Sequence, residues 1–238
     1  MERKQEEQGI IAAVVLAAGL GKRMNSTVPK QFMELAGRPM ITYALEAFEK
    51  SPVDQVVLVA GAEELEYCRR EIVSAWGFRK VTGVVAGGKE RYHSVYEGLK
   101  ALEDCAYVLI HDGARPLVDE SIIRAALGGA REYGACVVGM PVKDTIKVSD
   151  AEGFAVQTPD RSALWQVQTP QAFAYRLVRE AYDRLMAQPA LQKGITDDAM
   201  VVESLTGERV KLILGSYKNM KVTTPEDMEI AEVFLRGR

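Results

Sequence analysis

A segment rich in glycine and cationic residues follows the first apolar run of the chain: LAAGLGKRMNSTVPKQF, residues 16–32. Gly19 and Gly21 allow backbone N–H groups to approach an anion closely. Arg23 and Lys30 supply fixed positive charge and can flank a triphosphate from two sides. The segment contains neither G-x-G-x-x-G nor the Walker pattern, so neither standard phosphate-binding motif is present. It is therefore predicted to hold a triphosphate, the alternative being a surface turn with solvated cations.

A carboxylate and a guanidinium form a second candidate site in the stretch HDGARP. Asp112 ends an apolar run, where a carboxylate can hold Mg²⁺ against a nucleotide phosphate. Arg115 can form a bidentate clamp on a second phosphate. The alternative is an Asp–Arg pair that closes a loop, but two opposed charges are costly to bury without a use. His111 is expected to be packed and not catalytic.

Glycines and hydroxyls add to the same predicted site. Gly88 follows Gly87 and precedes a predicted helix whose first turn contains Ser94, which suits either contact with a base or ribose or a local cap. Further polar residues follow later in the chain: Asp144, Thr145, Arg161, Thr169 in QTPQ, Thr196, Asp197, Asp198 and Lys221. Many cations with one carboxylate and no evident nucleophile suit phosphoryl or nucleotidyl transfer, in which positioning and charge stabilisation do most of the work.

Composition excludes several other classes of protein. The chain has 238 residues, a net charge of −3 and 47% hydrophobic residues, so neither nucleic acid nor membrane is expected as a partner. Two histidines are too few for a His-rich metal site. Three widely spaced cysteines indicate buried thiols in a reducing compartment, and with no signal peptide the protein is predicted to be cytoplasmic.

Strand and helix patterns alternate along the chain and predict the scaffold of this site. Unbroken apolar runs, typical of strands buried on both faces of a parallel sheet, occupy residues 10–18, 55–61, 81–88, 107–113 and 135–142. Helical periodicity separates them, with Pro39 expected at a first helical position. The prediction is an α/β, doubly wound, mostly parallel Rossmann-like sheet.

One domain is expected over residues 1–238, with a flexible tail at 1–9. Residues 143–160, called the arm below, alternate in polarity around SDAEG and predict a protruding β-hairpin. Such a hairpin is marginal alone, so a second subunit is expected to pack on it. Beyond it a helix, the loop TDDA, the strand VKLILG and a closing helix capped by Thr224 are predicted.

Seven motifs, taken together and in order, resemble one family. LAAGLGKRM with PKQF, GGKERYHSV, HDGARP, PVKDTIK, QTPQAF, TDDA and NMKVTTPEDM are similar to the 2-C-methyl-D-erythritol 4-phosphate cytidylyltransferases of the non-mevalonate isoprenoid pathway. The resemblance covers about Ala13 to Phe234. It implies a nucleotidyltransferase fold, a homodimer held by the arm, and Mg²⁺-dependent transfer of CMP from CTP with release of pyrophosphate.

The resemblance also implies roles for individual residues. Arg23 and Lys30 would stabilise charge on the triphosphate in the transition state, and Asp112 would face Mg²⁺ or ribose. The residues around the cytidine and its phosphates would be Ala17, Ala18, Gly19, Gly21, Gly88 and Ser94. The residues positioning the alcohol phosphate would be Arg115, Thr145, Arg161 and Lys221, with Thr169 of QTPQ in the binding site. One departure is Lys89, where an acidic residue is common in the family.

Three other functions are alternatives for this set of residues. A ribitol-5-phosphate cytidylyltransferase would share the loop, the arm and much of the tail, but the small Ala114 before Arg115 favours methylerythritol phosphate. An NAD(P)-binding oxidoreductase would need a third glycine where Met24 stands and an acidic residue at the end of the second strand, where residues 60–62 are Ala, Gly and Ala. A noncatalytic nucleotide sensor would not need Arg161 in addition to the triphosphate cations.

Overall fold

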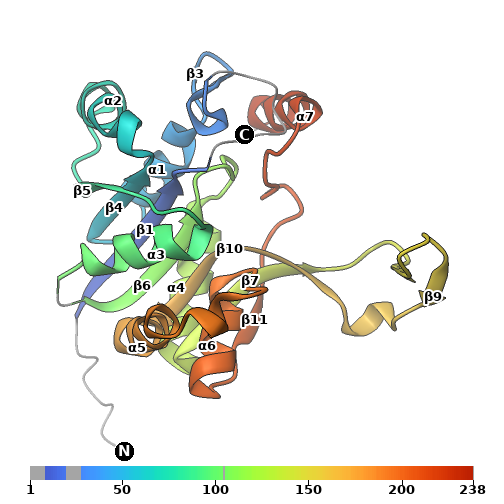
Figure 1. The fold of residues 1–238 in the computed structure, drawn as a ribbon. Coiled ribbons are helices and arrows are strands. Elements are labelled where there is room, and N and C mark those ends of the chain that lie inside the picture. Colours follow the sequence, from blue (N-terminus) through green and yellow to red (C-terminus); the bar gives the residue numbers. More distant parts are fainter. Residues whose placement is uncertain (1–8, 20–27, 104, 238) are drawn as a thin grey trace, which may run out of the picture.

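A seven-stranded sheet runs through the body in the order β11-β7-β10-β6-β1-β4-β5 (Figure 1). The computed structural model describes residues 9–19, 28–103 and 105–237. The strands of the sheet are β1 Ile10–Ala17, β4 Gln55–Ala60, β5 Val81–Ala86, β6 Cys105–Asp112, β7 Ala135–Pro141, β10 Trp165–Ala174 and β11 Lys211–Leu214. Only β10 is antiparallel to its neighbours, β6 and β7, while the other adjacent pairs are parallel. The predicted mostly parallel α/β sheet is confirmed.

The central strand β1 shows why its sequence is an unbroken apolar run. Ile11, Ala13 and Val15 are buried in one hydrophobic core, whereas Ala12 and Val14 are buried in the other. Successive side chains of a strand point to opposite faces, so a strand covered on both sides needs apolar residues at every position.

Helices cover both faces of the sheet. On one face lie α1 Ile41–Lys50, α4 Glu120–Tyr133 and the helical segment of residues 62–74, which includes α2 Leu65–Tyr67. On the other lie α3 Arg91–Lys100, α5 Tyr175–Ala187 and α6 Asp198–Thr206. No helix in the described part of the chain is long and apolar enough to cross a membrane.

The closing helix α7, Pro225–Arg236, begins as its sequence predicts. Thr224 and Asp227 form a reciprocal capping box, and Pro225 occupies the first turn. The helix packs over a small core that contains Leu35, Val222 and Ala231. This core ties the segment before α7 to the ligand edge of the sheet.

Two local predictions are wrong. Pro39 is not the first residue of a helix, because it pairs in the short ribbon of β2 Glu34–Leu35 and β3 Arg38–Pro39, and α1 begins only at Ile41. The TDDA stretch is not simply a loop before a strand, because α6 begins within it at Asp198. Two-residue strands and a nine-residue helix are too short to show a clear period.

The arm projects away from the body as a hairpin of β8 Val148–Ser149 and β9 Ala155–Gln157 (Figure 1). Its turn places Gly153 at a φ of 89°, a backbone conformation that glycine adopts without steric cost. Phe154 and Val156 are 66% and 62% exposed. The predicted hairpin is therefore present, with apolar side chains that the rest of this chain leaves uncovered.

Candidate active site

A cavity of about 500 Å³ lies at the carboxyl ends of β1, β5 and β6. This is the edge at which open parallel sheets bind ligands. It brings together these predicted residues: Ala18, Gly19, Lys30, Gly88, Ser94, Asp112 and Lys221. Gly21 and Arg23 lie outside the described residues.

Gln31 holds the segment around Lys30 against the end of β1. The side-chain amide of Gln31, which is buried, donates to the carbonyl oxygens of Ala17 and Gly19. Lys30 extends into the cavity and its Nζ donates to the carbonyl oxygen of Val222 at 2.9 Å.

Gly87 and Gly88 make room for the start of α3. A Cβ on Gly87 would lie 2.5 Å from the Ala18 Cβ, and one on Gly88 would lie 2.4 Å from the Cβ of His93, so neither position accepts a side chain without movement. The Gly88 N–H donates to Ser94 Oγ at 3.1 Å. Ser94 therefore fixes the glycine loop, whereas the cap of α3 is formed by Glu90 and His93, and Ser94 also lines the cavity.

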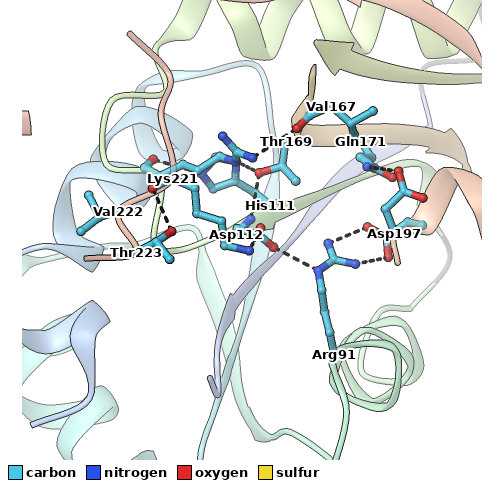
Figure 2. A network of polar contacts seen from close by, with 12 residues as sticks. Arg91, His111, Asp112, Val167, Thr169, Gln171, Asp197, Lys221, Val222 and Thr223 are labelled. Atoms are coloured by element: carbon cyan, nitrogen blue, oxygen red, sulfur yellow. Dashed lines mark hydrogen bonds and ion pairs between the residues drawn. The ribbon is translucent and has the colours of Figure 1, made fainter. Parts of the chain in front are cut away.

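Asp112 stands at the centre of the polar network in Figure 2. Its Oδ2 accepts from Lys221 Nζ at 2.7 Å and its Oδ1 accepts from Arg91 Nε at 3.1 Å. Burial would raise the pKa of this carboxyl, but the two cations and the nearby Arg115 outweigh burial and hold the pKa well below its usual range. Asp112 is therefore ionised at every physiological pH, with cationic partners on both oxygens.

Arg91 is held from its other side by a second carboxylate. Its Nη1 and Nη2 donate to the two oxygens of Asp198 at 2.8 Å each, and Tyr182 Oη donates to Asp198 Oδ1 at 2.6 Å. Burial would lower the pKa of Arg91, yet Asp198 and Asp112 raise it well above its usual value. Arg91 thus bridges two carboxylates that come from β6 and α6.

Hydrogen bonds of Thr169 with Asp112 and His111 hold the end of β6 against β10. Thr169 Oγ1 accepts from the Asp112 N–H at 3.0 Å and lies 3.0 Å from His111 Nδ1. The other ring nitrogen, Nε2, lies 3.3 Å from the carbonyl oxygen of Arg115. Burial lowers the pKa of His111 to about 4, so the imidazole is neutral and packed, as predicted.

A second cavity of about 580 Å³ adjoins the first and lies between β7, β10 and the α6–β11 region. It shares Arg91, Asp112 and Lys221 with the first cavity, and Arg115 and Thr169 line it as well. The guanidinium of Arg115 donates to the carbonyl oxygens of Asn219, at 2.8 Å, and Val167, at 3.4 Å. Asp112 pairs with Arg91 and Lys221 and not with Arg115, so the loop-closing Asp–Arg pair weighed above is not formed.

Two predicted residues lie apart from both cavities of this chain. Thr145 belongs to the arm, and Arg161 begins a short 3-10 helix directly after it; both are exposed. Arg161 Nη1 donates to the carbonyl oxygen of Lys143 at 2.7 Å, which joins the two legs of the arm. Within the described residues, neither Thr145 nor Arg161 lines either cavity.

Known proteins resemble this chain over nearly all of its length. A family model described as 2-C-methyl-D-erythritol 4-phosphate cytidylyltransferase matches residues 11–237. The chain belongs to this family. A member from Lachnospira eligens is 51% identical over 226 residues, covering 94% of this chain and 99% of its own. A member from Lachnoclostridium phytofermentans is 49% identical over 226 residues, covering 95% and 96% of the two chains.

Solved structures agree with this family membership. The 4-diphosphocytidyl-2C-methyl-D-erythritol synthase of Anaerococcus prevotii has a TM-score of 0.83 and 31% identity, with 96% of each chain covered. The 2-C-methyl-D-erythritol 4-phosphate cytidylyltransferase of Thermus thermophilus has a TM-score of 0.75 and 31% identity, with 94% and 98% covered. The chain is accordingly an enzyme, a cytidylyltransferase, and the family resemblance of the motifs is confirmed.

Three residues of this family member were not singled out from the sequence. Arg91 lies within GGKERYHSV, where the glycines and Ser94 give the stronger sequence signal. Tyr182 occupies an apolar position of a helix and carries no signal of its own. Gln31, between Lys30 and Phe32, could have been noticed because it is polar at a position that precedes a buried aromatic residue.

The described residues fit a metal ion that arrives with a nucleotide. No group of three or more His, Cys, Asp or Glu side chains that could hold a metal is found among them. Mg²⁺ in nucleotide enzymes is commonly bound by one or two carboxylates together with substrate phosphates. Asp112 is a permanently ionised carboxylate on the cavity wall, and each of its oxygens has a second lone pair available.

Proposed function

We propose that this cytidylyltransferase transfers CMP from CTP to 2-C-methyl-D-erythritol 4-phosphate, with release of pyrophosphate and formation of 4-diphosphocytidyl-2-C-methyl-D-erythritol. The observation that carries the proposal is the shared wall of the two adjoining cavities. Arg91, Asp112 and Lys221 line both, so a donor in one cavity and an acceptor in the other would meet at these side chains.

In this reaction a phosphate oxygen of the acceptor attacks the α-phosphorus of CTP, and the bond from that phosphorus to the bridging oxygen of pyrophosphate breaks. The enzyme supplies no nucleophile, because the acceptor's own phosphate is one. Lys30 and Arg23 are proposed to stabilise charge on the triphosphate as the bond breaks. Lys221 is proposed to exchange its partner Asp112 for the phosphate that arrives in the cavity.

The nucleotide is proposed to occupy the first cavity. β1 ends at Ala17, and Ala18 and Gly19, which follow it, line this cavity together with Gly88. Glycine loops that precede a helix allow a ribose or phosphate to approach the backbone closely. Gly21 is proposed to contribute in the same way.

A divalent cation such as Mg²⁺ is proposed to be held by Asp112 together with the phosphates of CTP. When bound, such an ion neutralises charge on the triphosphate. Asp112 is suited to this because its backbone N–H donates to the Thr169 hydroxyl and its carboxylate oxygens accept from Arg91 and Lys221.

The acceptor phosphate is proposed to bind beside the second cavity, near Arg115 and Lys221. Arg161 and Thr145 of this chain lie away from that cavity, so we propose that they position the acceptor in the site of a second copy. The homodimer would be joined through the arm, whose Phe154 and Val156 are exposed in the single chain. We further propose a cytoplasmic location, which the three buried free cysteines support.

The proposed function is tested by pyrophosphate release from CTP with Mg²⁺, with methylerythritol 4-phosphate and ribitol 5-phosphate as separate acceptors. Release with methylerythritol 4-phosphate, and little with ribitol 5-phosphate, is expected. Release only with ribitol 5-phosphate would keep the nucleotide chemistry but overturn the proposed acceptor.

A further inference from the structure

A tyrosine outside both cavities is joined to the active site by consecutive hydrogen bonds. Tyr182 Oη donates to Asp198. Both terminal nitrogens of Arg91 also donate to Asp198, and Arg91 Nε donates to Asp112. Among the described residues, neither Tyr182 nor Asp198 lines either cavity, whereas Arg91 and Asp112 line both. The chain of bonds therefore runs from the core between α5 and α6 to the shared wall of the site.

We propose that Tyr182 is a positioning residue for cytidylyl transfer, a role that rests on the function proposed above. Its hydroxyl fixes the orientation of the Asp198 carboxylate. The fixed carboxylate in turn sets the plane of the Arg91 guanidinium, and through Nε the position of Asp112.

The Tyr182 hydroxyl and the Asp198 carboxylate are both buried, so they are hydrogen-bonded to each other and not to bulk water. Tyr182 and Asp198 are both 0% exposed. A phenylalanine would fill the same apolar space between α5 and the sheet, but it could not donate to a buried carboxylate. Asp198 Oδ1 accepts from both Tyr182 and Arg91, so a phenylalanine would remove one of the two donors to this buried oxygen.

Arg91 stands between two carboxylates, and its contact with Asp198 is bidentate and shorter than its single bond to Asp112. It is the first residue of α3, and its side chain is 28% exposed toward the cavities. The fork geometry of a guanidinium on a carboxylate is planar and bidentate, so rotation of Asp198 rotates Arg91 with it. Misplacement of a group at a reacting centre by about 1 Å can lower a rate by about 100-fold.

The first test compares Tyr182→Phe with a matched control, Tyr175→Phe. Tyr175 lies on the same helix, α5, and its Oη donates to the carbonyl oxygen of Leu99 at 2.8 Å, away from Asp198. Tyr182→Phe removes one buried hydrogen bond to a charged group. This loss is expected to lower kcat about tenfold, with little change in the KM for CTP. Tyr175→Phe is expected to keep kcat. A normal kcat in Tyr182→Phe would overturn the proposal.

A double variant separates positioning from a general loss of structure. In an Arg91→Lys background, the planar fork with Asp198 is gone, so adding Tyr182→Phe is expected to lower kcat by less than twofold further. If the two losses multiply, Tyr182 acts independently of Arg91 and the proposal fails.

A third measurement needs no substrate and so remains informative even if the proposed acceptor is wrong. The Arg91 Nε–H resonance, assigned by its disappearance in Arg91→Lys, reports directly on the bond to Asp112. Its exchange with water is expected to be at least several-fold faster in Tyr182→Phe than in the wild type, and unchanged in Tyr175→Phe. Equal exchange in all three would overturn the positioning role, whereas wild-type inactivity with both alcohol phosphates would overturn only the proposed function.

Discussion

The cationic side chains of the site differ in the partners that hold them. Lys221 pairs with the Asp112 carboxylate, and Arg91 pairs with both Asp112 and Asp198. Lys30 donates to the carbonyl oxygen of Val222, which is neutral. All three side chains line the first cavity, where the triphosphate is proposed to bind.

Lys30→Ala is expected to lower kcat by about 10²–10³, the range for removing one charge-stabilising donor. The free energy of unfolding should fall by about 1 kcal/mol at most, because one partly buried hydrogen bond is lost. Steady-state kinetics and urea denaturation measure the two effects. Lys100→Ala, which removes an exposed lysine at the end of α3, is the control for a change in overall charge. A large loss of stability with near-normal kcat would contradict the catalytic role of Lys30.

The buried imidazole of His111 predicts an acid-sensitive fold. Burial lowers its pKa from 6.5 to about 4, so the unfolded state binds the proton more readily than the folded state. Its contribution to stability is complete above pH 6.5 and is lost as the pH falls through about 4; it amounts to about 3 kcal/mol. NMR titration of the two histidines, assigned with His111→Gln, measures this pKa directly. Titration of His111 near its ordinary pKa would contradict the prediction.

At the scale of elements, two helices begin with an aspartate cap but differ in what they carry. Asp197 caps α6 by accepting from the Met200 N–H, and Asp119 caps α4 by accepting from the Ile122 N–H. The first residue of α6 is Asp198, the partner of Arg91, whereas α4 packs on the opposite face of the sheet. The two caps are alike in chemistry and differ in their distance from the site.

Asp197→Ala and Asp119→Ala are therefore expected to have different effects. Each should lower the free energy of unfolding by about 1–2 kcal/mol through loss of the cap. Only Asp197→Ala should also lower kcat/KM, because the first turn of α6 holds Asp198 and because Asp197 also accepts from Gln171. Thermal denaturation and steady-state kinetics test the pair. Equal losses of activity in both variants would show that activity follows stability alone.

The elements also show how far the sequence leads. Five apolar runs predict β1, β4, β5, β6 and β7, because strands buried on both faces must be apolar throughout. The same runs place Asp112 correctly at a strand end. Arg91 and Asp198, by contrast, are 107 residues apart, and their pairing depends on how α3 and α6 pack on one face of the sheet. No local sequence pattern predicts a contact between residues so far apart, and the nine residues of α6 are too few to show a helical period.

At the scale of the whole molecule, the arm leaves the body after β7 and returns to it at β10 (Figure 1). Arg161 follows the arm and lies apart from both cavities of its own chain. If Arg161 positions the acceptor as proposed, its distance from both cavities of its own chain is explained by its reaching the site of a second copy. The proposed dimer thus predicts how two impaired variants should behave when they are combined in one dimer.

Arg161→Ala alone is expected to raise the KM for the acceptor phosphate while leaving the affinity for CTP intact. Mixed dimers of Arg161→Ala and Lys30→Ala subunits should regain activity, because one site would carry both lesions and the other neither, giving about half the wild-type rate. Homodimers of each variant, purified in the same way, are the controls. No recovery in tagged, purified mixed dimers would place Arg161 in the site of its own chain.

The antiparallel direction of β10 has a further consequence. Because β10 runs against β6 and β7, its first residues lie at the ligand edge, where β7 ends. The chain therefore enters and leaves the arm beside the cavity lined by Thr169. An enzyme whose subunits clasp through such an arm is subject to mass action. If the proposed dimer forms, turnover per subunit should fall on dilution below the dimer dissociation constant, so that cellular abundance would set how active each molecule is.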